Sequence, residues 1–180
     1  SQAETAKPVT LGKRTDLRAV PLVTIDGSDA RDFDDAVYAE ADSDPKNKGG
    51  YRILVAIADV AHYVRPGDPL DNEARKRGNS VYFPDRVVPM LPEALSNGLC
   101  SLRPNEDRAC LAVHIYLSSE GEIRRHEFVR GLMRSAASLE YAQLQKALDG
   151  HPDATLERLM ADVVAPLHGA YLALDAARHK

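Results

Sequence analysis

Apolar residues in the first third of the chain form short runs separated by polar segments, a pattern typical of strands. Leu22–Ile25 is one such run and leads directly into Asp26, while Ala36–Ala41 forms another after an acidic stretch. Tyr51–Asp59 is rich in β-branched and large apolar residues, so it predicts a buried strand. The polar segment Asp42–Gly50 predicts the loop that connects the last two runs.

The second half of the chain alternates between apolar and polar residues and then changes to helical spacing. Ala109–Leu117 alternates with period two, and Ser118–Gly121 joins it to Glu122–Arg134, which predicts an antiparallel hairpin. Apolar residues then recur at helical spacing over Leu139–Leu148 and Ala154–His179. The whole pattern predicts an α+β fold: a mixed, largely antiparallel sheet with helices toward the C-terminal end.

Proline, glycine and capping residues mark the ends of the predicted helices. Asp68–Gly78 predicts a short helix with Asp68 as its N-cap, Pro69 in its first turn and Gly78 beyond its last residue. Pro166 should kink or divide the final helix, because proline removes a backbone donor and clashes with the preceding turn.

Composition is typical of a folded domain outside the membrane. The chain has 180 residues, of which 44% are hydrophobic and 28% charged. Its longest apolar run, Ile53–Ala61, contains Asp59 and is far shorter than the roughly 20 residues that cross a bilayer. Cys100 and Cys110 form neither a metal motif nor a disulfide framework, so we expect buried thiols in a cytoplasmic protein.

Charge and the ends of the chain refine this description. The net charge of −4 weighs against a broad basic nucleic-acid surface, although metal ions can neutralise phosphates locally in a nucleic-acid enzyme. Residues 1–15 have almost no apolar periodicity and predict a flexible lead-in to a domain over 16–180. The last helical pattern has no closing Gly or Asn, so we expect the domain to continue beyond this chain.

The strongest chemical signal is the acidic stretch TIDGSDARDFDDAVY at residues 24–38. Its carboxylates Asp26, Asp32, Asp34 and Asp35 lie within ten residues, which is costly unless a cation relieves their repulsion. Oxygen ligands suit Mg²⁺, with Mn²⁺ as the alternative, and the absence of His and Cys from the stretch disfavours zinc. Two such ions can bind a phosphate from both sides, activating water and stabilising the leaving oxygen.

Other interpretations of the acidic stretch fit less well. A solvated acidic turn would hold no metal, but such a turn does not need the apolar Phe33 between its acids. A phosphohydrolase with Asp26 as nucleophile needs a second Asp two residues later, where Ser28 stands. An EF-hand fails because no register supplies both its glycine and its final glutamate.

The chain resembles the catalytic RNB domain of the ribonuclease II family in three segments: LVTIDGSDARDFDDAVY (22–38), VAIADVAHYVRPGDPLDNEARKRGNSVYFPDRVVPMLPEALSNGLCSLRPNEDR (55–108) and SLEYAQLQKAL (138–148). The stretch SVYFPDRVVPMLPE favours one bacterial branch of that family. The resemblance covers roughly the first half of the RNB domain. It implies processive, metal-dependent 3′→5′ hydrolysis of single-stranded RNA to nucleoside 5′-monophosphates.

The resemblance also implies roles for individual residues. Asp26, Asp32 and Asp35 match the metal ligands of the family, and Asp34 matches the carboxylate most critical to chemistry. Tyr82 matches the tyrosine that stacks on the 3′-terminal nucleotide, although without the family a packed core tyrosine is the simpler interpretation. A catalytically inactive module that binds metal or RNA is the alternative.

The rest of the machinery is expected elsewhere in a longer, monomeric protein: a later arginine and glutamate, a second stacking aromatic, and cold-shock and S1 domains. Half a domain leaves core surface uncovered, so we expect this chain to self-associate or to be partly disordered at Ser1–Arg14 and in the last helix. Among lesser candidates, Asp59 and His62 could brace the metal site, with a structural role favoured. Asn97, Ser101 and Arg103 could contact the RNA backbone.

Overall fold

The computed structural model describes residues 2–179 and is built on nine strands. They span Thr15–Asp16 (β1), Val23–Asp26 (β2), Asp35–Ala41 (β3), Tyr51–Ala58 (β4), Val81–Tyr82 (β5), Val87–Val88 (β6), Asp107–Leu117 (β7), Ile123–Arg134 (β8) and Ala137–Glu140 (β9). Seven of them form one sheet in the order β1-β8-β7-β4-β3-β2-β9, and β5 pairs with β6 in a separate hairpin. Only β1–β8 and β2–β9 are parallel, so the expected mixed, largely antiparallel sheet is confirmed.

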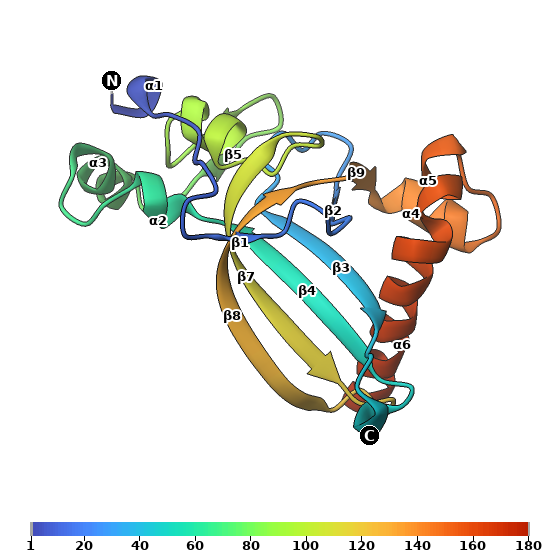
Figure 1. The fold of residues 1–180 in the computed structure, drawn as a ribbon. Helices are drawn as coiled ribbons and strands as arrows, with labels where there is room; N and C mark the ends of the chain where they lie inside the picture. Colours follow the sequence, from blue (N-terminus) through green and yellow to red (C-terminus); the bar gives the residue numbers. More distant parts are fainter. Residues whose placement is uncertain (1, 180) are drawn as a thin grey trace.

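Long antiparallel strands form the centre of this sheet (Figure 1). β4 lies between β3 and β7, pairing with β7 along its whole length and with β3 from Tyr51 to Ile57, and β7 continues into the predicted hairpin with β8. Successive side chains of a strand point to opposite faces, and Leu54, Ala56 and Ala112 are buried on one of them. On the side of β8 away from β7, β1 pairs only with Gly131 and Leu132, so most of that outer edge of β8 has no strand beside it.

The helices form two groups, one at an end of the sheet and one beside β3 and β4. They span Gln2–Thr5 (α1), Val60–Tyr63 (α2), Pro69–Arg77 (α3), Tyr141–Leu148 (α4), Ala154–Leu159 (α5) and Ala165–Arg178 (α6). Figure 1 shows α1, α2 and α3 together at one end, whereas α6 runs along β3 and β4. The buried apolar side chains form two cores that meet at the start of β2. Leu22, just before β2, belongs to the core that contains Leu54 and Ala112 of the central strands, and Val23 belongs to the core formed with β9 and the C-terminal helices.

The helix signals in the sequence are confirmed where capping residues set them. The Asp68 carboxylate accepts the Asp71 N–H at 2.8 Å, Pro69 opens α3, and Gly78 follows with φ +79°. Pro166 lies in the first turn of α6, and a π-helical turn over Met160–Val164 separates that helix from α5. The expected division of the last helix is therefore confirmed.

One predicted helix begins too early. The helical spacing from Leu139 onward is misleading, because Leu139 and Glu140 belong to β9 and pair with Ile25 and Asp26 of β2. The helix α4 begins only at Tyr141, where the sheet ends. Pairing with a distant strand therefore overrode the local pattern.

The described part of the lead-in, residues 2–14, packs on the domain. Ala3 is 2% exposed, and the Gln2 side chain donates to the Asp68 carboxylate at 2.7 Å. Arg14 reaches the buried Asp59 carboxylate at 2.7 Å. The domain boundary near residue 15 and the flexibility of this segment stay predictions. None of the helices within residues 2–179 is both long and apolar enough to cross a membrane.

One face of the sheet carries exposed apolar side chains. Ile57, Leu111 and Phe128 are 47%, 45% and 65% exposed on β4, β7 and β8. Ile57 and Leu111 are direct partners in the β4–β7 ladder, so their side chains are neighbours. Such a surface is what half a domain would leave uncovered, and the expected self-association stays a prediction.

The β7–β8 turn supplies a stability test. Gly121 has φ +83°, and a Cβ there would collide with the Ala173 carbonyl of α6, whereas Gly67 has φ +81° and open space around it. We expect Gly67→Ala to cost only the left-handed strain of roughly 1–2 kcal/mol. Gly121→Ala should cost clearly more because α6 must also move, as measured by urea unfolding. Equal losses would show that α6 does not pack tightly on this turn.

The two cysteines supply a chemical test of the core. Both are free and buried, and burial raises the pKa of each thiol to about 11. Because only the thiolate reacts, Cys100 and Cys110 should resist iodoacetamide at pH 8 in the folded chain and react quickly in urea. Rapid labelling under native conditions would contradict this burial.

Candidate functional site

Sheet topology brings the acidic stretch to one end of the sheet. β2 ends at Asp26 and β3 begins at Asp35, and because the two strands are antiparallel, both residues lie at the same end. The connecting loop, Gly27–Asp34, holds Asp32 and Asp34. All four aspartates singled out in the sequence therefore gather beside the ends of two adjacent strands.

The electrostatics of this loop reflect crowding of like charges. The pKa of Asp34 is raised by partial removal from water and then by the nearby carboxylates of Asp32, Asp35 and Asp26. The pKa of Asp26 is raised in the same way, first by desolvation and then by Asp35 and Asp32. No basic side chain within residues 2–179 forms an ion pair with any of these four carboxylates.

The donor set fits a hard cation in chemistry, but the side chains do not form a closed coordination shell. Across residues 2–179, no three His, Cys, Asp or Glu side chains are arranged closely enough to hold one metal ion. Oxygen donors with unbalanced negative charge nevertheless suit Mg²⁺, which retains several waters and needs few protein ligands. The loop can thus supply part of a metal site, with the remaining positions left to water and substrate.

The buried Ser101 hydroxyl holds the acidic loop, Gly27–Asp34, through hydrogen bonds to its backbone. The Phe33 N–H donates to Ser101 Oγ at 3.0 Å, and the same hydroxyl donates to the Arg31 carbonyl at 3.2 Å. The Leu102 N–H donates to the Phe33 carbonyl at 2.8 Å. Ser101 is fully buried, so the interpretation that it contacts the RNA backbone is wrong.

Neighbouring strands complete this support. The Ala58 N–H at the end of β4 donates to the Asp34 carbonyl at 2.9 Å. Arg108 of β7 is 8% exposed, and its Nε donates to the Ser101 carbonyl at 2.8 Å. The acidic loop is therefore anchored through backbone groups, which leaves its carboxylates free to bind.

Asp59 has a structural role, and His62 lies beside the arginine that pairs with it. Asp59 is 5% exposed, and its carboxylate accepts from Arg14 Nη2 at 2.7 Å. The same Arg14 nitrogen lies 3.4 Å from His62 Nδ1. The structural interpretation of Asp59 is confirmed. The sequence did not reveal that Arg14 is the ion-pair partner of Asp59, because the two residues are far apart in the chain.

The remaining candidates lie near the loop or on the hairpin. Tyr82 lies on β5 and is 68% exposed, so the packed-core interpretation is wrong and its ring face is accessible. Asn97 and Arg103 line a cavity of about 730 Å³ together with Arg31 and Phe33 of the acidic loop. Their position beside the loop supports a binding role, and the RNA contact itself stays a prediction.

Fold and site together define an α+β domain with an oxygen-only, negatively charged site at one end of a mixed sheet. The model of the RNB domain family matches residues 14–180, and the chain belongs to that family. It is the catalytic-domain family of ribonuclease R-like 3′→5′ exoribonucleases, as the resemblance of the acidic stretch and its flanks predicted.

Individual relatives agree with this assignment. Ribonuclease R of Escherichia coli (strain K12) is 52% identical over 170 residues, covering 93% of this chain and 20% of the relative. The structure of Mycoplasma genitalium RNase R in complex with double-stranded RNA superposes with TM-score 0.90 at 31% identity, over 98% of this chain and 31% of that one. Yeast Ssd1, a pseudonuclease, shares the fold at TM-score 0.69 and 23% identity, over 84% of this chain and 19% of that one.

The branch of the family indicated by the sequence is thus ribonuclease R. The chain spans about a fifth of the length of the Escherichia coli relative that it matches. The family and the fold are therefore assigned to this chain, and the activity of a whole protein is a separate question.

Removal of the Ser101 hydroxyl should loosen the acidic loop. In Ser101→Ala the Phe33 N–H loses its buried acceptor, which costs roughly 1–3 kcal/mol. Hydrogen exchange of the Phe33 amide should accelerate roughly ten- to a hundredfold, as measured by NMR. Ser96→Ala is the control, because the Ser96 hydroxyl donates only to the adjacent Asn97 side chain. Unchanged Phe33 exchange in Ser101→Ala would contradict the anchoring role.

Proposed function

We propose that this chain is part of the catalytic domain of a processive 3′→5′ exoribonuclease that hydrolyses single-stranded RNA to nucleoside 5′-monophosphates. The observation that carries the proposal is the group of four aspartates, which have no basic partner within residues 2–179 and are positioned by adjacent strand ends in a domain of the RNB family. The relatives of known structure with RNA bound support RNA as the substrate.

In this proposal Asp26, Asp32 and Asp35 would hold Mg²⁺, or Mn²⁺, together with water, and Asp34 would act next to them on the scissile phosphate. When bound, the cation supplies Lewis-acid chemistry: it lowers the pKa of water and neutralises charge on the phosphate. The backbone bonds of Asp34 to Ala58 and of Phe33 to Leu102 keep the carboxylates in place before substrate arrives. Preorganised groups of this kind lower a barrier without reorganising during the reaction.

Tyr82 is the proposed contact for the 3′-terminal nucleotide. Its exposed ring lies on a short hairpin that is separate from the main sheet. Stacking tolerates any base, because every base has a π-face, and a processive enzyme must accept each nucleotide in turn. Cold-shock and S1 domains elsewhere in a longer, monomeric, cytoplasmic protein would supply the grip on RNA that a chain with net charge −4 lacks.

An inactive module that binds metal or RNA remains the alternative function. The shared fold of a pseudonuclease shows that the architecture alone does not define activity. Retention of all four aspartates, together with the buried anchors that position them, favours the active enzyme.

The decisive variant is Asp34→Asn in the full-length protein. It keeps the size of the side chain and removes its charge, so degradation of end-labelled single-stranded RNA in Mg²⁺ or Mn²⁺ should be abolished. RNA affinity should stay within about threefold, since the change removes no RNA-binding cation. Turnover should also stop in a chelator.

Asp29→Asn is the matched control, because it removes the same charge from the same loop at an exposed position. It should retain most of the activity. Undiminished turnover in Asp34→Asn would refute the proposed mechanism, and an inactive unaltered full-length protein would favour the binding module. The isolated chain, assayed in parallel, shows how much of the activity this part carries.

A further inference from the structure

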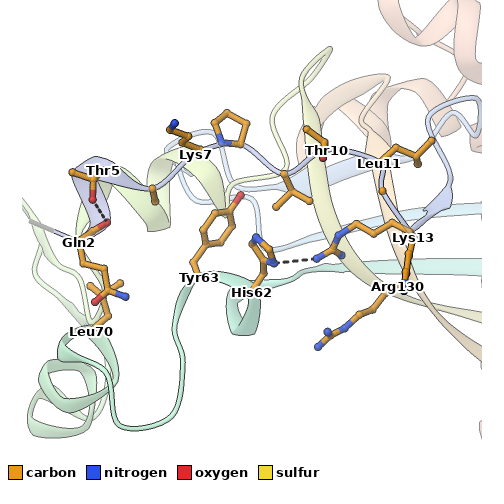
Figure 2. A pocket seen from close by; sticks show the side chains of 15 residues that line it. Gln2, Thr5, Lys7, Thr10, Leu11, Lys13, His62, Tyr63, Leu70 and Arg130 are labelled. Carbon is orange, nitrogen blue, oxygen red and sulfur yellow. Dashed lines mark hydrogen bonds between the residues drawn. The ribbon is translucent and has the colours of Figure 1, made fainter.

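A second cavity, of about 770 Å³, lies away from the aspartates (Figure 2). It is bounded by the N-terminal segment 2–14, by His62 and Tyr63 of α2, and by Arg130 near the end of β8. In Figure 2 the N-terminal segment passes over Tyr63 and His62, and Arg130 extends from the neighbouring strand. Leu70 of α3 also lines the cavity, so four parts of the chain border a space that the proposed catalytic chemistry does not use.

The charge of this cavity is opposite to that of the whole chain. Of the described residues that line it, four are basic and none is acidic: Lys7, Lys13, Arg14 and Arg130. The chain as a whole carries a net charge of −4. Positive charge is thus concentrated at this cavity, and such a concentration favours anionic ligands.

Three of these four cations remain available to a ligand. Arg14 is committed to the protein, because its side chain is 11% exposed and binds the buried Asp59 carboxylate and the Gly131 carbonyl. The Arg130 side chain is 60% exposed and lies 3.9 Å from the same carboxylate, so Asp59 cannot balance both arginines. In the described structure the exposed Lys7 and Lys13 have no ion-pair partner.

His62 adds a neutral donor to these charges. The Arg14 guanidinium can only donate, so its contact with His62 Nδ1 at 3.4 Å makes that nitrogen the acceptor. The neutral ring therefore carries its proton on Nε2. Burial and the Arg14 charge lower the pKa of His62, which keeps the ring neutral near pH 7. Its edge-to-face contact with Tyr63, with ring centroids 4.9 Å apart, fixes its orientation.

We propose that this cavity binds a backbone phosphate of the RNA strand, held by Lys7, Lys13 and Arg130 with a hydrogen bond from His62. The inference rests on the proposed function and adds a binding site to it. Cations on two elements around an open cavity suit a phosphodiester within a continuing strand. An exonuclease that starts at the 3′ end removes the terminal nucleotide, and the uncleaved RNA continues on the 5′ side of the scissile bond. The phosphate in this cavity therefore lies 5′ of the cleaved bond.

The cavity is also coupled to the aspartate loop by a short path. Asp59, which anchors Arg14, directly follows Ala58, and the Ala58 N–H holds the Asp34 carbonyl. A strand that fills the cavity and the aspartate site therefore runs along one end of the same sheet. Binding there would keep the RNA aligned between successive cleavages.

The test uses the double variant Lys13→Gln/Arg130→Gln in the full-length protein. Affinity for a fluorescent oligoadenylate of about 10 nucleotides, within the range that single-strand sites cover, is measured in a chelator so that hydrolysis plays no part. We expect an affinity loss of about tenfold. The plot of the logarithm of the association constant against the logarithm of salt concentration has a negative slope. Its magnitude should decrease by about 0.7, the value for one phosphate contact on a single strand.

The control, Lys46→Gln/Arg124→Gln, removes the same charge outside the cavity and should bind within about twofold of the unaltered protein. Equal weakening by both variants would overturn the site in favour of a net-charge effect.

The His62 ring signals in NMR give a second readout in the unaltered protein, and they should shift on addition of the RNA. If inorganic phosphate shifts them and RNA does not, the cavity is a free-phosphate site and the proposal fails. Loss of hydrolysis with intact cavity binding would refute only the proposed function.

Discussion

Repulsion among four carboxylates is the constraint on which the rest of this structure depends. Asp26 and Asp35 lie at the ends of adjacent strands, and Asp32 and Asp34 lie in the loop between them. No internal ion pair within residues 2–179 relieves them, so backbone hydrogen bonds from Ala58 and Leu102 and the buried Ser101 hydroxyl hold the loop in place. The fold thus stabilises the loop through its main chain, and the negative charge of the four carboxylates remains without a balancing side chain in the described residues. A cation is the natural partner for such a charge.

Local pattern was sufficient for most of the fold. Period-two alternation predicted the β7–β8 hairpin, and capping residues predicted α3 and the division at Pro166, because each depends on neighbours in sequence. The helical spacing of Leu139 was misleading, since its strand pairing with Ile25 is a long-range contact. A short sequence window contains no information about such a partner.

In the candidate site, too, local sequence predicted some features and long-range contacts determined the others. The spacing of the aspartates and of the apolar Phe33 pointed to an acidic centre, and the family assignment agrees with it. The sequence did not reveal that Ser101 anchors the loop or that Arg14 neutralises Asp59, because both partners are distant in the chain. It also left Tyr82 open, since exposure is a tertiary property.

The parallel pairing of β2 with β9 has a consequence for how the domain is made. β2 is bordered by β3, which follows it closely, and by β9, which is synthesised much later. During synthesis on the ribosome, one edge of β2, the strand that carries Asp26, therefore stays unpaired until β9 has emerged as far as Glu140. Such non-local pairing is slow to form, so the strand that carries Asp26 gains its second neighbour late in synthesis.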